Sequence, residues 1–128
     1  MRELGSSQPT AVELEILRIL WELGPSPVRG IHARLAQAKG TNYSTTVKML
    51  SVMLAKGLVK RDDAASPLVY RAAMSRDKAA KKFLNELIEK VYEGSAMSLV
   101  LHALAGGKAS KAQIDEARKL LDEMEGKP

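Results

Sequence analysis

The sequence predicts a mainly α-helical protein, with a winged helix-turn-helix head of three helices and a two-stranded β wing, followed by a three-helix dimerisation tail. Apolar residues recur at helical spacing in three segments before residue 57 and in three more after residue 75. Between these two groups, residues 58–71 have the pattern of a short β-hairpin. We therefore expect a winged-helix DNA-binding domain at 1–75 and a helical dimerisation domain at 76–128.

The three helices of the head are marked by their end signals. Thr10 begins a capping box, and the helix that follows should end at Gly24-Pro25. The second helix is expected to open at Ser26-Pro27, because Pro is well tolerated in a first helical turn. The third should run from about residue 44 to Gly57, a residue type that commonly ends helices.

The wing and the tail follow Gly57. Residues 58–61 and 68–71 are predicted strands joined by a turn at 62–67. A two-stranded ribbon is marginally stable alone, so it should pack on the three helices. In the tail we expect a long helix capped by Ser75, a short apolar helix at 97–104, and a last helix that begins with the capping box of Ser110.

The apolar residues of the tail are predicted to form a dimer interface. Each buried Leu-sized side chain stabilises by about 1.5–3 kcal/mol, and three such helices cannot hide all these side chains from water within one chain. The alternative is a tail that folds back on the head. The predicted interface residues are Phe83, Leu84, Leu87, Ile88, Val91, Tyr92, Leu99, Val100, Leu101, Leu104, Ile114, Leu120 and Leu121.

Basic residues are concentrated in the head. Residues 23–61 include seven Lys or Arg and no Asp or Glu, whereas residues 76–128 carry ten basic and nine acidic residues. This distribution favours a head that meets double-stranded DNA and a tail that meets protein, and the alternative is a solvated basic surface. The chain has no Cys, no apolar signal segment near its first residues and no apolar run long enough for a membrane, so we expect a cytoplasmic protein.

The third helix and the wing carry most of the predicted DNA contacts. At 100° per residue, Tyr43, Val47, Leu50 and Leu54 share one side of the helix, with Thr46 and Met53 at its flank. The opposite side carries hydroxyls, Lys and Val, which suit base edges in a major groove. Basic residues of the wing should hold phosphates. For Arg29 the alternatives are a phosphate contact and simple solvation. The predicted DNA-binding residues are Arg29, Tyr43, Ser44, Thr45, Thr46, Lys48, Met49, Val52, Lys56, Lys60, Arg61 and Arg71.

Motifs for other chemistry are absent from the sequence. His32 and His102 have no ligand partners at helical spacing, and a zinc site needs three or four ligands. Gly107-Lys108-Ala109-Ser110 lacks the earlier Gly of a phosphate loop. The sequence offers no candidate Ser-His-Asp catalytic triad. We therefore expect no enzyme, no cofactor and no metal.

The sequence resembles the penicillinase repressor (BlaI/MecI-type) family of winged-helix transcriptional regulators over nearly its whole length, from about Pro9 to Met124. The resemblance lies in Glu13-Leu14-Glu15-Ile16-Leu17 with Leu20-Trp21, in residues 43–50, in Lys56-Gly57-Leu58-Val59-Lys60-Arg61, in residues 68–72, in Tyr92-Glu93-Gly94-Ser95 and in Ser98-Leu99-Val100-Leu101. It implies a homodimeric repressor of dyad-symmetric operators, often with TACA/TGTA half-sites. In some members, a membrane sensor-protease system leads to cleavage of the repressor in its tail.

Two features depart from the family pattern. Staphylococcal members are cut at an Asn-Phe pair where this chain has His102-Ala103, so we expect that repression is not relieved by a cut there. The copper-responsive branch has a C-terminal cysteine cluster, which this chain lacks. Two alternatives to a DNA-binding repressor are a winged-helix protein–protein interaction module and a regulator with a ligand in its tail. The scarcity of aromatic and polar groups in the tail argues against the second.

Overall fold

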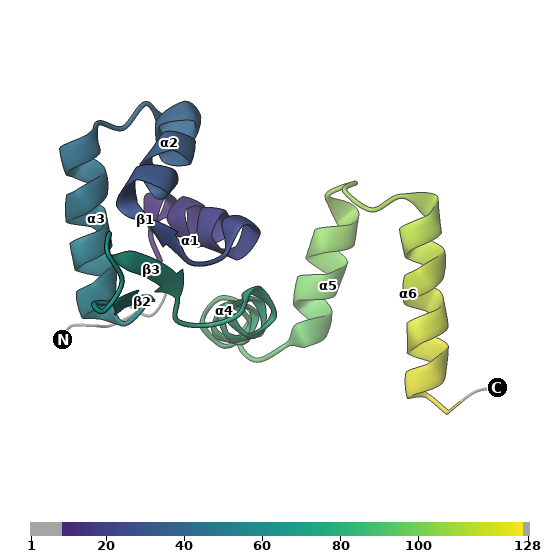
Figure 1. The fold of residues 1–128 in the computed structure, drawn as a ribbon. Helices are drawn as coiled ribbons and strands as arrows, with labels where there is room; N and C mark the ends of the chain where they lie inside the picture. The colour runs from purple at the N-terminus through teal and green to yellow at the C-terminus, as the bar shows by residue number, and fades with distance from the viewer. Residues whose placement is uncertain (1–8, 127–128) are drawn as a thin grey trace. The chain divides into compact units, whose positions relative to one another are not determined.

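The computed structural model describes residues 9–126. Within this range the chain forms two compact units, one that ends at Phe83 and one that begins at Leu84, so the fourth helix contributes to both. The elements, labelled in Figure 1, are α1 (Ala11–Leu23), β1 (Ser26–Pro27), α2 (Val28–Lys39), α3 (Tyr43–Lys56), β2 (Val59–Asp62), β3 (Val69–Ala72), α4 (Arg76–Lys90), α5 (Ala96–Ala105) and α6 (Lys111–Met124). The predicted mainly helical winged-helix fold is confirmed.

The head is built from α1, α2, α3 and the sheet (Figure 1), and the buried core residues come from these three helices and from β2 and β3. Ile16, Ile31, Leu35 and Leu50 are completely buried, and at least one of them comes from each of the three helices. Burying side chains of this size is the main source of stability for the head. The exposed side of α3 is therefore fixed by which of its residues enter this core.

The start of α1 is the predicted capping box. Thr10 N–H donates to Glu13 Oε1 (2.9 Å), and Glu13 N–H donates to Thr10 Oγ1 (3.2 Å). These two bonds satisfy backbone donors that a helix start leaves without partners. Glu13 is buried despite its charge. Its carboxylate also accepts hydrogen bonds from Lys56, the last residue of α3.

The sheet differs from the predicted two-stranded wing because it has three antiparallel strands in the order β1-β3-β2. Ser26 pairs with Tyr70 and Pro27 with Val69, so the expected first turn of α2 is an edge strand and the helix begins at Val28. Two residues are too few to show the alternation that marks a strand in a sequence. Proline lacks an N–H and is tolerated at a sheet edge.

Gly57 ends α3 and turns the chain into β2, as the sequence predicts. Its backbone is left-handed, with φ of 80°, a conformation that glycine adopts without steric cost. The following N–H, from Leu58, donates to the carbonyl of Met53 (2.9 Å). This closure places the wing directly after the C-terminal end of α3.

The helices of the tail begin at serine caps. Ser75, Ser95 and Ser110 accept hydrogen bonds from the backbone N–H groups of Lys78, Ser98 and Gln113 respectively. Neither α5 nor α6 has a single buried residue in the described chain. Among the helices in the described range, none combines the length and the apolar character that crossing a membrane requires.

Candidate nucleic-acid interface

The inward side of α3 consists of Thr46, Leu50 and Met53, all completely buried. The predicted inward side was centred instead on Val47, Leu50 and Leu54 with Tyr43. In the structure Tyr43 is 47% exposed and Val47 is 40% exposed. The helix is therefore rotated by a fraction of a turn from the predicted orientation, and Val47 faces solvent together with Lys48.

Thr46 explains this rotation and is a correction to the predicted DNA contacts. Its hydroxyl oxygen lies 2.9 Å from Nδ1 of His32 on α2 and 3.4 Å from the carbonyl oxygen of Asn42. These partners satisfy the hydroxyl inside the core, where an unpaired polar group would be costly. Since Thr46 has no exposed surface, its side chain joins α3 to α2 and is closed off from any ligand outside the head.

The outward side of α3 carries most of the residues predicted for base contacts. Asn42 caps the helix, and its Oδ1 accepts from Thr45 N–H (2.9 Å) and from the Ser44 hydroxyl (3.0 Å). Met49 is half-buried and packs against the core, so it lies at the edge of this surface. We define the exposed face of α3 as Ser44, Thr45, Val47, Lys48, Ser51, Val52 and Ala55, which are all exposed.

Three members of the exposed face of α3 are absent from the predicted DNA-binding residues, namely Val47, Ser51 and Ala55. The signal that could have found them is the spacing of Thr46, Leu50 and Met53, which defines the true inward side. The prediction placed Thr46 and Met53 only at the flank of the apolar side and counted Thr46 among the DNA contacts, whereas a Thr with a hydrogen-bonding partner can be buried. The surface has no carboxylate and contains one ammonium group, that of Lys48.

Lys56 was predicted to bind DNA, but its ammonium group is paired with a carboxylate within the head. Nζ donates to both carboxylate oxygens of Glu13, at 2.8 and 3.0 Å. Burial raises the pKa of Glu13, but the hydrogen bonds from Lys56 and from the backbone of Thr10 outweigh it, and the pKa lies below its ordinary value. Lys56 thus neutralises a buried carboxylate and ties the end of α3 to the start of α1.

The wing places Lys60 and Arg61, which were both predicted to hold phosphates, on opposite faces of β2. Lys60 on β2 lies directly opposite Arg71 on β3, and both side chains are exposed. Arg61 pairs with Tyr70, which is buried, so it belongs to the other face of the strands. Its guanidinium forms an ion pair with Asp63, and the hydrogen bonds that it donates to Asp63 and to Tyr70 raise the pKa of Arg61.

Arg29 and Tyr43 lie close together although 14 positions separate them in the sequence. Both line a small hollow of about 260 Å³ with Pro67 and Leu68 of the segment before β3. The ring of Tyr43 contacts that of His32 edge to face, with 5.2 Å between the ring centres. The start of α2, the start of α3 and the wing therefore form one continuous surface.

Histidines and acidic residues are the candidate metal ligands of the described range. No cluster of three or more His, Cys, Asp or Glu side chains with suitable geometry occurs in the part of the chain that the structure describes. His32 contacts Thr46, and His102 Nδ1 lies 2.8 Å from the hydroxyl of Tyr92. His102 and Ala103 lie within α5.

The predicted interface residues of the tail present a large apolar surface. Phe83, Ile88, Tyr92, Leu99 and Ile114 are half-buried. The others are exposed in the single chain: Leu84, Leu87, Val91, Val100, Leu101, Leu104, Leu120 and Leu121. Met97 and Met124, which the prediction left out of the interface, are also exposed.

Comparisons with known proteins agree in one family. A family model described as penicillinase repressor matches residues 9–123. Methicillin resistance regulatory protein MecI from Staphylococcus aureus is 23% identical over 113 residues, which cover 88% of this chain and 92% of that protein. The penicillinase repressor of Bacillus licheniformis is 21% identical over 116 residues, 91% of each chain. Both are named as regulatory proteins rather than as enzymes.

Among solved structures, a MarR family transcriptional regulator from Silicibacter pomeroyi is similar to this chain. It has 18% sequence identity and a TM-score of 0.47, and the match covers 93% of this chain and 70% of that one.

Proposed function

This chain belongs to the penicillinase repressor family of winged-helix transcriptional regulators, and we propose that it acts in the cytoplasm as a homodimeric repressor on a dyad-symmetric DNA operator. The exposed face of α3 is the observation that carries the proposal. It combines hydroxyls, one lysine and small apolar groups and lacks carboxylates. A major groove presents acceptors, donors and thymine methyl groups, which these side chains match.

Within this proposal, base reading belongs to α3 and phosphate binding to its surroundings. Lys48 can donate to guanine or phosphate, Thr45 can bond in either direction, and Val52 can meet a thymine methyl group. Lys60 and Arg71 form a pair of neighbouring cations on the outer side of the wing, and neither has an ion-pair partner among residues 9–126. Such cations suit phosphates, which set the register of the protein on DNA.

Arg29 and Tyr43 are assigned to the DNA backbone beside the recognition helix. They share the hollow with Pro67 and Leu68, next to the start of α2. In helix-turn-helix proteins the helix before the recognition helix crosses the DNA backbone. A guanidinium and a phenol there are suited to phosphate oxygens, and the apolar wing residues are suited to a deoxyribose.

The proposed homodimer is supported by the apolar surface of the tail. Eight residues of the predicted interface are exposed in the single chain, and α5 and α6 bury none of their side chains. Covering a surface of this kind is worth about 25 cal/mol per Å² of apolar area. A second copy supplies an identical, self-complementary surface, and two heads related by a two-fold axis then match a dyad-symmetric operator.

The specificity is tested by selecting duplexes from a random pool with the full-length protein. We expect an enriched inverted repeat whose half-sites lie one helical turn apart, about 10–10.5 base pairs, or a multiple of that distance. An enriched sequence without dyad symmetry would contradict the operator proposal. Failure to enrich any sequence would favour the interaction-module alternative.

The dimer is tested by sedimentation of Leu87→Asp against a matched control. Leu87 in α4 is 43% exposed, and Leu23 at the end of α1 is 44% exposed, so the same substitution at each site removes a similar apolar surface. Leu87→Asp should dissociate the dimer because it places a carboxylate in an apolar interface. Leu23→Asp should leave it intact. A dimer that survives Leu87→Asp would refute the assignment of this face.

A further inference from the structure

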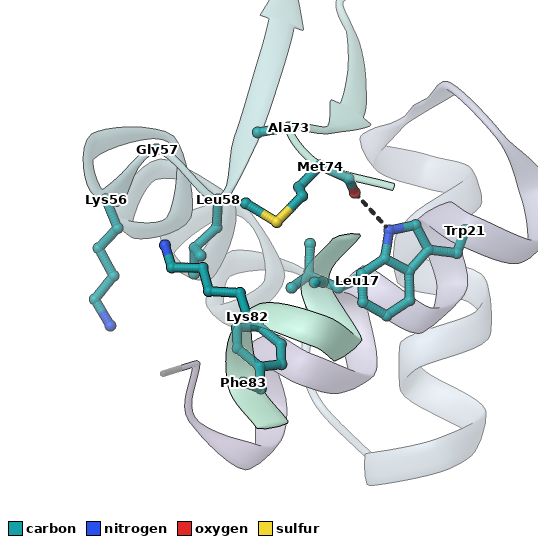
Figure 2. Close-up of a pocket in the computed structure, with 10 residues that line it drawn as sticks. Leu17, Trp21, Lys56, Gly57, Leu58, Ala73, Met74, Lys82 and Phe83 are labelled. Carbon is teal, nitrogen blue, oxygen red and sulfur yellow. Dashed lines mark hydrogen bonds between the residues drawn. The ribbon is translucent and has the colours of Figure 1, made fainter. Parts of the chain in front are cut away.

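The head contains a pocket that the repressor function does not use. Its volume is about 310 Å³, at the lower end of the range of about 300–1,000 Å³ for small-molecule sites. Figure 2 shows its walls, which come from α1, from the turn between α3 and β2, from the segment after β3 and from the start of α4. All of them belong to the compact unit that ends at Phe83.

The walls are suited to an apolar body with a ring. Leu17, Trp21, Leu58, Met74 and Phe83 line the pocket. The indole N–H of Trp21 already donates to the carbonyl of Met74 (2.9 Å, Figure 2), so the ring offers mainly its apolar surface to an occupant. Aromatic rings and a thioether favour contact with another ring.

One of the two cations of the pocket has no partner among residues 9–126, and this favours a negatively charged occupant. Lys56 and Lys82 both line the pocket, and no acidic residue does. Lys56 is neutralised by Glu13. Lys82 has no hydrogen bond or ion pair among residues 9–126, and Figure 2 shows its side chain extending along the pocket toward the side of Lys56 and Leu58.

We propose that this pocket binds a small carboxylate with an apolar body, of the size and shape of an arylalkyl acid, and that Lys82 pairs with the carboxylate. The apolar part would contact Trp21 and Phe83 and would displace water from the pocket. The ammonium of Lys82 distinguishes an acid from its neutral analogue. Since α3 ends at Gly57 in the pocket wall, the ligand also contacts the helix that carries the proposed DNA-reading side chains.

Tryptophan fluorescence gives a direct readout, because Trp21 is the only Trp of the chain. The full-length protein is titrated with 4-phenylbutyrate and with its neutral analogue 4-phenylbutanamide. We expect saturable binding of the acid with a Kd of about 0.1–1 mM, as ligands of this size reach. The amide should bind about fivefold more weakly, since a partly exposed ion pair contributes up to about that factor.

Two lysine variants assign the charge recognition. Lys82→Met should raise the Kd of the acid about fivefold and leave the Kd of the amide unchanged. Lys81→Met is the matched control, because Lys81 is the neighbouring residue of α4, is exposed, pairs with Asp77 and does not line the pocket. It should leave both ligands unchanged.

Three outcomes would overturn the proposal. The first is the lack of a saturable fluorescence change up to 10-fold above the expected Kd. The second is equal binding of acid and amide, which would indicate unspecific adsorption to apolar surface. The third is an equal effect of Lys82→Met and Lys81→Met, which would indicate a general charge effect.

Discussion

Replacing Lys56 by Met separates a structural role of this residue from a role in DNA binding. The Glu13 side chain is only 2% exposed, and it receives both hydrogen bonds of the Lys56 ammonium. Methionine keeps a similar length and an apolar stem but removes the charge. The buried carboxylate then keeps the hydrogen bond from the Thr10 backbone N–H (2.9 Å) but has lost both bonds from the ammonium.

The size of the effect follows from the burial of the two partners. Breaking a fully buried ion pair by removing one partner costs about 3–5 kcal/mol. Lys56 is 36% exposed, so water can partly replace the ammonium, and the expected loss is about 2 kcal/mol. For a domain of this size the melting temperature should fall by about 10 °C.

The assay is thermal unfolding followed by circular dichroism, with duplex binding measured well below the melting temperature. Lys48→Met is the matched control on the same helix, and it should weaken DNA binding without changing stability. Adding Glu13→Gln to Lys56→Met should restore part of the lost stability, since no charge is then buried alone and Gln keeps the capping box. An unchanged melting temperature of Lys56→Met, together with a loss of DNA binding, would refute the structural role.

Three further predictions concern the proposed interface and the buried carboxylate. Lys48→Met should weaken binding to the selected duplex by about 1–3 kcal/mol and binding to random DNA by less, as measured by fluorescence anisotropy. Lys78→Met is the control with the same change of charge. Equal losses of binding to both duplexes would show that Lys48 does not read bases. Lys60→Ala should make the slope of log K against log salt concentration shallower by about 0.9. Arg61→Ala should change this slope less, because the guanidinium of Arg61 is paired with Asp63. A larger effect of Arg61→Ala would contradict the wing geometry. Because the folded-state pKa of Glu13 is lowered, its stabilisation is present above the unfolded value of about 4.3 and is lost as the pH falls through the folded value, so wild type should lose more stability than Glu13→Gln between pH 5 and pH 3 in denaturant titrations.

The sequence alone was sufficient for the elements whose signals are local. The capping boxes at Thr10 and Ser110 and the glycine at the end of α3 act through bonds within about five residues, so their residue types mark the helix ends directly. The apolar spacing of the tail likewise predicts three helices with unpaired apolar sides. These features require no knowledge of which segments meet in space.

Only the tertiary structure decided which residues face outward. Thr46 is inward because its hydroxyl contacts His32, 14 positions earlier, and Lys56 is paired because α3 ends beside Glu13, 43 positions earlier. The strand at Ser26–Pro27 exists only through its pairing with β3. In each case a polar group or a short segment takes its place from a partner that is distant in sequence, and helical periodicity contains no information about that partner.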